Sequence, residues 1–396
     1  MEALIQSFYT KYARTQTQLK RSFVDRVNWE NRFIGIKGSR GVGKTTLILQ
    51  HIKENYQADG TVLYVSLDSI HFASKNLYHF ADQFYKKGGV LLALDEVHKY
   101  PNWAKELKNI YDDMPNLKVV FTGSSLLHLR EAKADLSRRV VMYHMPGLSL
   151  REYIHFEINM MLPKYTLDEL LQDHVSISMS IAEKIKPLAY FDRYLKHGYY
   201  PFFKESLESF HSKLNEIILT SLEVDIPQFS LIQTSNIIYL KKLLGIISQS
   251  VPFKPNMKSL SERNGISLNT MKHYIKLLHD ADLLQLLHVP TKGINSLNKP
   301  EKVYLNNTNL MYNHSQQANI GNIRETFLFN QLEQITSVHA SKEADFLVDS
   351  KFTFEVGGSS KKKKQIDGIL NSYIIKDDIE IGSSQTIPLW LFGFLY

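Results

Sequence analysis

The stretch Gly38-Ser-Arg-Gly-Val-Gly-Lys44-Thr45 places four residues between its first glycine and a Gly-Lys-Thr end. Just before it, Phe33–Ile36 is a short apolar run typical of a buried strand, and Thr46–Tyr56 continues as an amphipathic helix. A glycine-rich turn between a strand and a helix lets backbone N–H groups surround a phosphate, and the N-terminus of the helix adds a favourable dipole. The pattern therefore predicts a phosphate-binding loop.

The side chains of this loop have distinct predicted roles. Lys44 supplies a point charge for the β- and γ-phosphates, and Thr45 supplies a hydroxyl for Mg²⁺. The residues expected to bind the nucleotide are those of the loop and the first residue beyond it: Gly38, Ser39, Arg40, Gly41, Val42, Gly43, Lys44, Thr45 and Thr46.

A second motif lies about fifty residues further on, where the apolar run Val90–Leu94 ends in the adjacent carboxylates Asp95 and Glu96. This is the form of a Walker B strand. Asp95 would hold Mg²⁺ through water, and Glu96 would orient or deprotonate the attacking water. A strand ending in two solvated acids is ordinary by itself. After a phosphate-binding loop, the pair favours hydrolysis of ATP over nucleotide binding alone.

Short apolar runs alternate with helical patterns over about the first 150 residues, which predicts a parallel α/β sheet. The expected strands are Phe33–Ile36, Thr61–Leu67, Val90–Asp95, Lys118–Thr122 and Val140–His144. The fourth strand leads into Ser124, which would lie between the loop and the Walker B acids. Ser124 is therefore either a sensor of the γ-phosphate or the N-cap of a helix that begins at Leu126.

A basic pair, Arg138 and Arg139, follows this strand. Arg139 is either an arginine finger that reaches the nucleotide of a neighbouring subunit or a solvated surface charge. The first interpretation implies a homo-oligomer.

The composition limits the class of protein. The 396 residues are enough for about two to three domains, and contents of 43% hydrophobic and 22% charged residues are ordinary for a globular chain. Without cysteine the chain has neither disulfides nor a cysteine-ligated zinc site. Because the first twenty residues are polar and charged, and no long uncharged apolar run occurs, we expect no secretory signal, no membrane partner and a cytoplasmic location. The net charge of +7 permits a nucleic-acid partner.

Beyond the sheet, Ser149-Leu-Arg-Glu152 predicts a capping box, and helical spacing follows to about residue 235. Residues 236–290 predict a winged helix-turn-helix, with a short helix that ends at Gly265, a second helix over Leu268–Asp280 and a strand over Leu283–Val289. The polar residues of the second helix suit either DNA or a protein partner: Asn269, Lys272, His273 and Lys276.

Three carboxylates are spread over the last hundred residues: Glu325 in a predicted helix, Asp345 near the start of a strand and Glu355 in the next strand. Acids on adjacent strands with a lysine just beyond are how metal-dependent nucleases hold Mg²⁺ and position water. Taken singly, each acid is unremarkable. The basic run Lys361–Lys364 follows them and is a second candidate for DNA contact.

Together these motifs resemble a widespread prokaryotic family in which an AAA-type ATPase domain precedes a C-terminal domain of unknown function, built from a winged helix and a nuclease-like fold. The resemblance implies that Asp95 and Glu96 act as Walker B, that Ser124 is the sensor and that Arg139 is the family's arginine. The matching stretches cover most of the chain: Gly38–Leu47, Leu94–His98, Thr122–Ser125, Leu136–Arg139, Leu148–Tyr153, Gly198–Pro201, Glu325, Asp345 and Glu355.

The departure from the family pattern lies at the nuclease-like end. The restriction-endonuclease pattern Glu-x-Lys reads Glu355-Val356-Gly357 here. Loss of the lysine removes the charge that lowers the pKa of the water and steadies the developing phosphorane. We therefore expect a degenerate nuclease-like domain, unless a lysine from Lys361–Lys364 reaches back.

The expected architecture is an AAA-type P-loop ATPase domain over 1–155, a helical lid or linker over 156–235, the winged helix over 236–292 and a restriction-endonuclease-like α/β domain over 293–396. The predicted function is a Mg²⁺-dependent ATPase that acts as a switch or motor, with a C-terminal partner or DNA. The alternatives are an ATP-gated, metal-dependent nuclease and an ATP-stabilised docking protein without significant turnover. The predicted catalytic residues are Lys44, Glu96, Ser124 and Arg139.

Overall fold

The computed structural model describes residues 2–73, 75–128, 136, 138–230, 232–249, 254, 256–290, 300–314, 318–361 and 366–396. The chain separates into two compact units. The first unit is Met1–Pro146 together with Asp225–Leu231, and the second is Gly147–Val224 together with Ile232–Tyr396. The segment 225–231 thus belongs to the first unit, although its sequence neighbours on both sides belong to the second.

A five-stranded parallel sheet lies at the centre of the first unit, with the strand order β2-β3-β4-β1-β5. Its strands are β1 (Phe33–Lys37), β2 (Val62–Ser66), β3 (Leu91–Asp95), β4 (Lys118–Gly123) and β5 (Val141–His144). All five expected strands are present, each within one residue of its predicted bounds. Strands β1 to β4 are buried almost throughout, because helices cover both faces of such a sheet and the strands therefore need no polar alternation.

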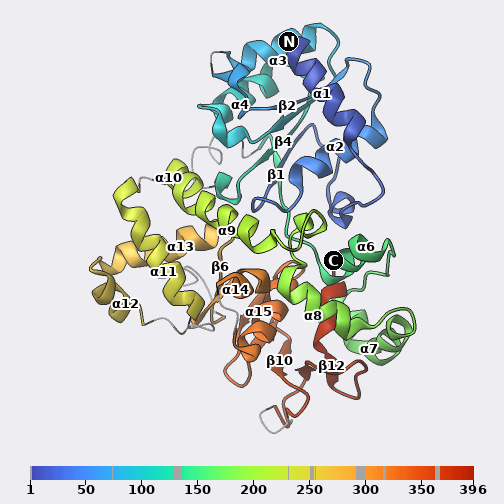
Figure 1. The fold of residues 1–396 in the computed structure, drawn as a ribbon, viewed down its shortest axis with the longest axis vertical. Helices are drawn as coiled ribbons and strands as arrows, with labels where there is room; N and C mark the ends of the chain where they lie inside the picture. Colours follow the sequence, from blue (N-terminus) through green and yellow to red (C-terminus); the bar gives the residue numbers. More distant parts are fainter. Residues whose placement is uncertain are drawn as a thin grey trace. The chain divides into compact units, whose positions relative to one another are not determined.

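Four helices flank this sheet: α1 (Glu2–Arg14), α2 (Lys44–Asn55), α3 (Leu77–Lys86) and α4 (Trp103–Asp113). In Figure 1, α1 and α2 lie on one side of the strands, and α3 and α4 lie on the other. Helix α2 begins at Lys44, two residues earlier than predicted, because its N-cap Gly43 has a left-handed φ of +98° and the loop turns directly into the helix. The short helix α10 (Ile226–Phe229) joins this unit from later in the chain.

The strand order determines which side chains meet. Strand β4 lies between β1, which leads into the 38–45 loop, and β3, which ends in Asp95. The carboxyl ends of parallel strands share one edge of a sheet, so the loop, Asp95 and Ser124 lie along the same edge. The predicted position of Ser124 between the loop and the acids follows from this order.

The second unit begins with helices α6 (Leu150–Ile158), α7 (Leu167–Ala182), α8 (Pro187–His197) and α9 (Phe210–Thr220). The predicted capping box opens α6, since Ser149 Oγ accepts from Glu152 N at 3.2 Å and Glu152 Oε2 accepts from Ser149 N at 3.1 Å. Helix α9 runs into a π-helical turn, Ser221–Asp225, and this turn leads into α10.

Three more helices and a strand pair follow: α11 (Ile237–Gln249), α12 (Met257–Asn264), α13 (Leu268–Asp280), β6 (Leu284–Leu287) and β7 (Lys302–Leu305). Helix α13 has the predicted bounds, α12 ends at Gly265 with a φ of +64°, and β6 pairs with β7 in antiparallel fashion.

The C-terminal part contains α14 (Thr308–His314), α15 (Ile320–Glu333) and a mixed sheet in the order β12-β11-β10-β9-β8. Strands β8, β9 and β10 form an antiparallel meander, and β10, β11 and β12 are parallel. The strands are β8 (Val338–Ala340), β9 (Phe346–Val348), β10 (Phe352–Gly357), β11 (Ser372–Lys376) and β12 (Thr386–Pro388).

Short 3₁₀ turns connect these elements: η1 (Ser22–Arg26), η2 (Ile70–Phe72), η3 (Val97–Lys99), η4 (Ser125–His128), η5 (Pro201–Lys204), η7 (Thr234–Asn236) and η10 (Leu389–Phe394). Within the described ranges, no helix has both the length and the apolar character needed to cross a membrane.

Candidate functional site

Lys44 is the first residue of α2, and its side chain reaches back to the loop that follows β1. The residue is 6% exposed, and its Nζ donates hydrogen bonds to the carbonyl oxygens of Gly38 and Ser39, both at 2.8 Å. A Cβ on Gly38 would approach the carbonyl oxygen of Met145 to 2.4 Å, and the φ of +157° at this position is also unfavourable for other residues, so glycine is required there. The loop therefore surrounds the ammonium group of Lys44, and this positive charge is what a site for an anion requires.

Arg21 supports the loop from outside. Its Nη1 donates to the carbonyl oxygen of Val42 at 2.6 Å and its Nη2 to that of Pro146 at 3.0 Å, and the arginine is 3% exposed. Val42 is also buried, whereas Gly41 and Thr46 are exposed. The loop thus has a fixed inner side and a solvent-facing side.

Asp95, at the end of β3, is 4% exposed. It accepts hydrogen bonds from three hydroxyls, namely Thr45 Oγ1 at 2.8 Å, Tyr64 OH at 2.5 Å and Thr122 Oγ1. Burial and the charge of Asp95 raise the pKa of Tyr64, so the phenol remains a donor. The contact between Thr45 and Asp95 brings together the two oxygen groups that were predicted to hold Mg²⁺, and oxygen ligands fit that hard cation.

Glu96 has a left-handed backbone, with a φ of +56°. This conformation is strained for a residue with a side chain, and such strain concentrates at functional sites. Its carboxylate is 22% exposed and lies 3.8 Å from Arg40 Nη1 and 3.4 Å from His98 Nε2. Burial raises the pKa of Glu96, against the charges of Lys44 and Arg40. A carboxylate of raised basicity suits a general base.

His98 is a site residue to which no sequence pattern assigned a role. It lies in η3, is 4% exposed, and its Nδ1 accepts from Ser124 N at 3.3 Å. Burial lowers the pKa of His98 to about 3, so the ring is neutral and its hydrogen is on Nε2, the atom nearest Glu96. The imidazole links the end of β4 to the predicted base. The only sequence signal for it is its place two residues after that base.

Ser124 follows β4 and is 7% exposed. Its hydroxyl accepts from Leu126 N at 3.4 Å, which is the capping contact, and it still carries a hydrogen to donate. Both interpretations of Ser124, as a cap and as a sensor, are compatible with this geometry.

Arg139 lies at the opposite edge of the sheet from the loop, because it precedes β5, whereas the loop follows the parallel strand β1. Its Nε and Nη2 pair with the carboxylate of Asp112 at 2.9 and 3.1 Å. A finger role for Arg139 therefore requires the nucleotide of a second subunit.

Arg40, in the loop, has a partner far along the chain. Its Nε and Nη2 donate to the two carboxylate oxygens of Asp225, both at 2.8 Å. Asp225 is 1% exposed, and its hydrogen bonds raise the pKa of Arg40, against the effect of burial. From the same segment, Gln228 donates to the carbonyl oxygen of His98, and the Phe229 ring lies 5.8 Å from the His98 ring. The segment 225–231 thus forms part of this site.

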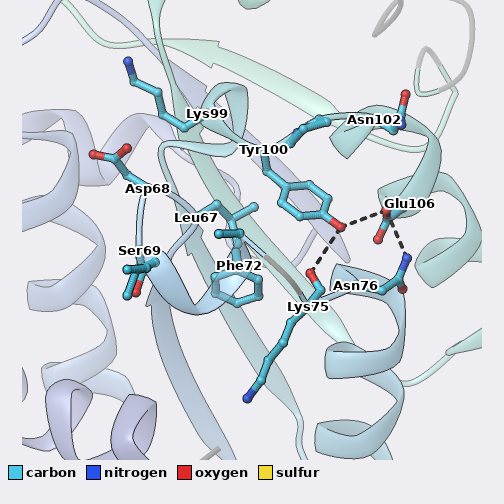
Figure 2. A pocket seen from close by; sticks show the side chains of 13 residues that line it. Leu67, Asp68, Ser69, Phe72, Lys75, Asn76, Lys99, Tyr100, Asn102 and Glu106 are labelled. Carbon is cyan, nitrogen blue, oxygen red and sulfur yellow. Dashed lines mark hydrogen bonds between the residues drawn. The ribbon is translucent and has the colours of Figure 1, made fainter.

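A pocket of about 510 Å³ adjoins this site at Lys99. Its lining comes from residues after β2 and from residues around the start of α4 (Figure 2): Leu67, Asp68, Ser69, Ile70, Phe72, Ala73, Lys75, Asn76, Lys99, Tyr100, Pro101, Asn102 and Glu106. Tyr100 OH donates to Glu106 Oε1 at 3.0 Å, which fixes one side of the pocket. Lys99 lies on the other side in Figure 2, and its Nζ is 4.0 Å from the carboxylate of Asp225.

The three C-terminal carboxylates meet in the second unit around lysines. Lys302 Nζ, from β7, lies 2.9 Å from Glu325 Oε2 and 3.2 Å from Asp345 Oδ1. Burial alone would lower the pKa of Lys302, but the charges of Glu325 and Asp345 raise it overall, so this lysine is charged. Tyr304 OH donates to Glu325 Oε2 at 2.7 Å. Glu355, on β10, is close enough for both other acids to raise its pKa.

Glu355 also has a lysine of its own. It is 2% exposed, burial raises its pKa, and it forms an ion pair with Lys361. A Cβ on Gly357 would lie 2.6 Å from Cβ of Lys361, so the stem of this lysine occupies the space beside position 357. A lysine does reach back to the acid, from 361 instead of 357. The rest of the predicted basic run, Lys362–Lys364, lies outside the described residues.

This arrangement does not fit the Mg²⁺ predicted for Glu325, Asp345 and Glu355. An ammonium group bridges the first two carboxylates, and a second one neutralises the third. In the part of the chain that the structure describes, no group of three His, Cys, Asp or Glu side chains is placed to hold a metal ion. The physical reason is charge, since carboxylates already paired with lysines have little net attraction for a divalent cation.

Comparison with known proteins agrees with the architecture of the first unit. Residues 30–154 match the family model of the AAA domain, and residues 188–320 match a domain of unknown function (DUF8612). Residues 30–154 thus resemble an AAA domain, in agreement with the parallel sheet and the loop over 38–45. Each match covers less than half of the chain, and no curated protein sequence matches it.

Several solved structures show similarity at low identity. A DNA replication initiation factor is 17% identical, with 70% of this chain and 88% of that chain covered and a TM-score of 0.26. AMPPCP-bound DnaA from Aquifex aeolicus is 15% identical, with 65% and 84% covered and a TM-score of 0.26. DnaA bound to AMPPCP and single-stranded DNA is 17% identical, with 65% and 85% covered and a TM-score of 0.26.

Proposed function

We propose that the chain binds ATP with Mg²⁺ at residues 38–46 and hydrolyses it, so that it alternates between two nucleotide states and acts as a switch or motor. One observation carries the proposal: Thr45 Oγ1 and Asp95 Oδ2 are 2.8 Å apart, and the residue before Thr45 is the buried Lys44, whose Nζ contacts the loop carbonyl of Gly38. Phosphate-binding and cation-binding groups are thereby joined at one sheet edge. Mg²⁺, when bound, neutralises charge on the phosphate oxygens.

The chain's own residues then have separate tasks. Lys44 attracts the β- and γ-phosphates, and Thr45 with Asp95 would hold the cation. Glu96 takes the proton of the attacking water, and its raised pKa favours this role over that of a bystander. Ser124 would donate its hydroxyl hydrogen toward the γ-phosphate. The raised basicity of Glu96 also favours hydrolysis over the alternative of a docking protein without turnover.

Two substitutions test this proposal. Lys44→Ala removes the charge that faces the phosphates and should abolish tight ATP binding. Glu96→Gln keeps the shape and removes the base, so ATP should bind and persist, with hydrolysis lower by about 10²–10⁴-fold. Glu54→Gln, an exposed acid of α2, serves as the matched control. The measurements are binding of a fluorescent ATP analogue and release of phosphate. Wild-type turnover by Glu96→Gln would reject the assignment.

For the second unit we propose a nucleic-acid-binding surface on α12 and α13. The support is the order of elements, in which two helices around Gly265 are followed by the antiparallel β6–β7 pair, as in a winged helix. The exposed polar and basic residues of this surface are Lys258, Arg263, Asn269, Lys272, His273 and Lys276. Binding of a labelled duplex and of a single strand at several salt concentrations tests it. No binding at about 50 mM salt would favour a protein partner.

The nuclease-like end is proposed to be catalytically silent. Lys361 does reach back to Glu355, but it pairs directly with that carboxylate, and Lys302 bridges Glu325 and Asp345. The acids that an ATP-gated nuclease would need for its metal ions are therefore all paired with ammonium groups. Plasmid and single-stranded substrates should stay intact with Mg²⁺ or Mn²⁺, with or without ATP. Metal-dependent cutting that disappears in Glu355→Ala would reverse this proposal.

A further inference from the structure

The guanidinium of Arg40 lies between two carboxylates. Asp225 binds it through two hydrogen bonds of 2.8 Å, and Glu96 Oε2 is 3.8 Å from its Nη1. Asp225 is almost completely buried, whereas the Glu96 carboxylate is 22% exposed. A bidentate contact of this kind is the strongest pairing an arginine makes, so Asp225 determines where Arg40 points.

If Asp225 leaves the site, the nearest carboxylate for Arg40 is Glu96. Leaving a partly buried guanidinium without a partner costs free energy, so Arg40 will form a close pair with Glu96. The movement needed is about 1 Å, the difference between the present 3.8 Å and an ordinary ion-pair distance. A carboxylate held in such a pair is a poor base, because the positive charge disfavours its protonation. The position of Asp225 therefore decides whether Glu96 is available.

We propose that docking of the segment 225–231 permits hydrolysis at the ATP site. When it is docked, the two hydrogen bonds from Asp225 hold Arg40 so that its Nη1 stays 3.8 Å from Glu96 and does not form a close pair with it. When it is undocked, Arg40 captures Glu96 and turnover stops while ATP stays bound. This inference rests on the proposed hydrolysis of ATP and adds its regulation.

The rest of the segment anchors it in this position. Gln228 donates to the carbonyl oxygen of His98, Phe229 packs near the His98 ring, and Ile226 is fully buried. His98 in turn lies 3.4 Å from Glu96, so the anchor and the base share one neighbour. A change in the segment thus reaches Glu96 through both Arg40 and His98.

Chain connectivity makes this segment suitable for regulation. Its flanking residues on both sides belong to the second unit, and the chain enters it through the π-helical turn Ser221–Asp225. Such turns are uncommon and frequently mark functional sites. A partner that binds the second unit and pulls on this connection would act on Asp225, which gives the C-terminal half a route to the ATPase.

The first experiment compares Asp225→Asn with the wild type. The amide keeps the size of the side chain and removes the charge that restrains Arg40. We expect kcat to fall by about tenfold or more, within the range that a general base contributes, with ATP affinity changed by less than about threefold. Glu223→Gln is the matched control, because it removes a carboxylate two residues earlier that pairs with Lys241. It should retain the wild-type kcat.

A double-mutant cycle separates this mechanism from a structural role of Asp225. In an Arg40→Met background no guanidinium can capture Glu96, so adding Asp225→Asn should change kcat by less than about twofold. The double variant also removes both buried charges, which keeps the test usable if the single variant folds poorly. An equal fall in both backgrounds, or an unchanged kcat in Asp225→Asn, overturns the inference while Glu96→Gln still supports hydrolysis. Wild-type turnover by Glu96→Gln instead removes the proposed function itself.

Discussion

Glu325, Asp345 and Glu355 form a cluster of acids in the C-terminal part. Replacing Lys302 by methionine removes one group from it, the ammonium between Glu325 and Asp345. Methionine keeps the length of the side chain and loses the charge. Lys302, Glu325 and Asp345 are only 15%, 16% and 19% exposed, so the two carboxylates would face each other with little water to screen them.

The expected cost follows from this burial. Removing one partner of a buried ion pair costs about 3–5 kcal/mol, and we expect about 3 kcal/mol because the three side chains keep some contact with water. At about 2–4 °C per kcal/mol for a unit of this size, the unfolding midpoint should fall by about 6–12 °C.

The effect of pH has a definite sign. The pKa of Lys302 is raised in the folded state, so the stability it contributes is present below its unfolded pKa and is lost only as pH rises through its folded pKa, beyond the neutral range. In Lys302→Met this contribution is absent, so the loss of stability relative to the wild type should persist through the neutral range. It should shrink only as pH rises through the folded pKa of Lys302.

The assay is thermal unfolding without nucleotide, with EDTA or with Mn²⁺. Lys302→Met leaves Glu325 and Asp345 without the bridging ammonium, so Mn²⁺ should restore stability, by about 2.7 kcal/mol at a concentration of 100 times its Kd. The further change Glu355→Gln should weaken that response. Lys342→Met, at an exposed position before β9, should stay within about 0.5 kcal/mol of the wild type. A wild-type chain stabilised by Mn²⁺ as strongly as the variant, or a variant as stable as the wild type, would refute this reasoning.

Four further outcomes are expected. Because burial raises the pKa of Glu96, kcat should fall on acidification at a higher pH than an ordinary glutamate would give, and a profile that is flat down to the usual glutamate pKa would contradict the role of Glu96. His98→Phe keeps an aromatic ring beside Phe229 and removes the Nε2 hydrogen, so it should lower kcat with little effect on ATP affinity, as measured by phosphate release and nucleotide titration. If subunits assemble, Arg139→Ala should lower the ATPase activity of concentrated protein. Light scattering and phosphate release test this, and full activity of a strict monomer would exclude an arginine-finger role for Arg139. Lys272→Ser with Lys276→Ser should reduce the slope of log affinity for DNA against log salt by about one to two, whereas loss of affinity without a change in slope would argue against phosphate contacts.

Local patterns in the sequence determined the elements and the chemistry of the ATPase half. The loop, the two acids after β3 and the five strands can be predicted because phosphate binding needs glycines at fixed spacing and a doubly covered parallel sheet needs continuous apolar runs. The same holds for α13, whose bounds follow from its N-cap Ser267 and its 3.6-residue periodicity. Each of these signals is contained within about fifteen residues, which is the range over which spacing carries information.

Only the tertiary structure decided which distant charges meet. Arg40 and Asp225 are 185 positions apart, and Lys302 lies 43 positions from Asp345. Each of these residues read alone is an ordinary polar residue. The sequence left open whether a lysine from Lys361–Lys364 replaces the one missing at Gly357, and only the fold of the chain after β10 brings Lys361 to Glu355. The strength of an ion pair depends on the distance between the two side chains and on their burial. Both are determined by the packing of helices and strands, which the local spacing of residues in the sequence does not reveal.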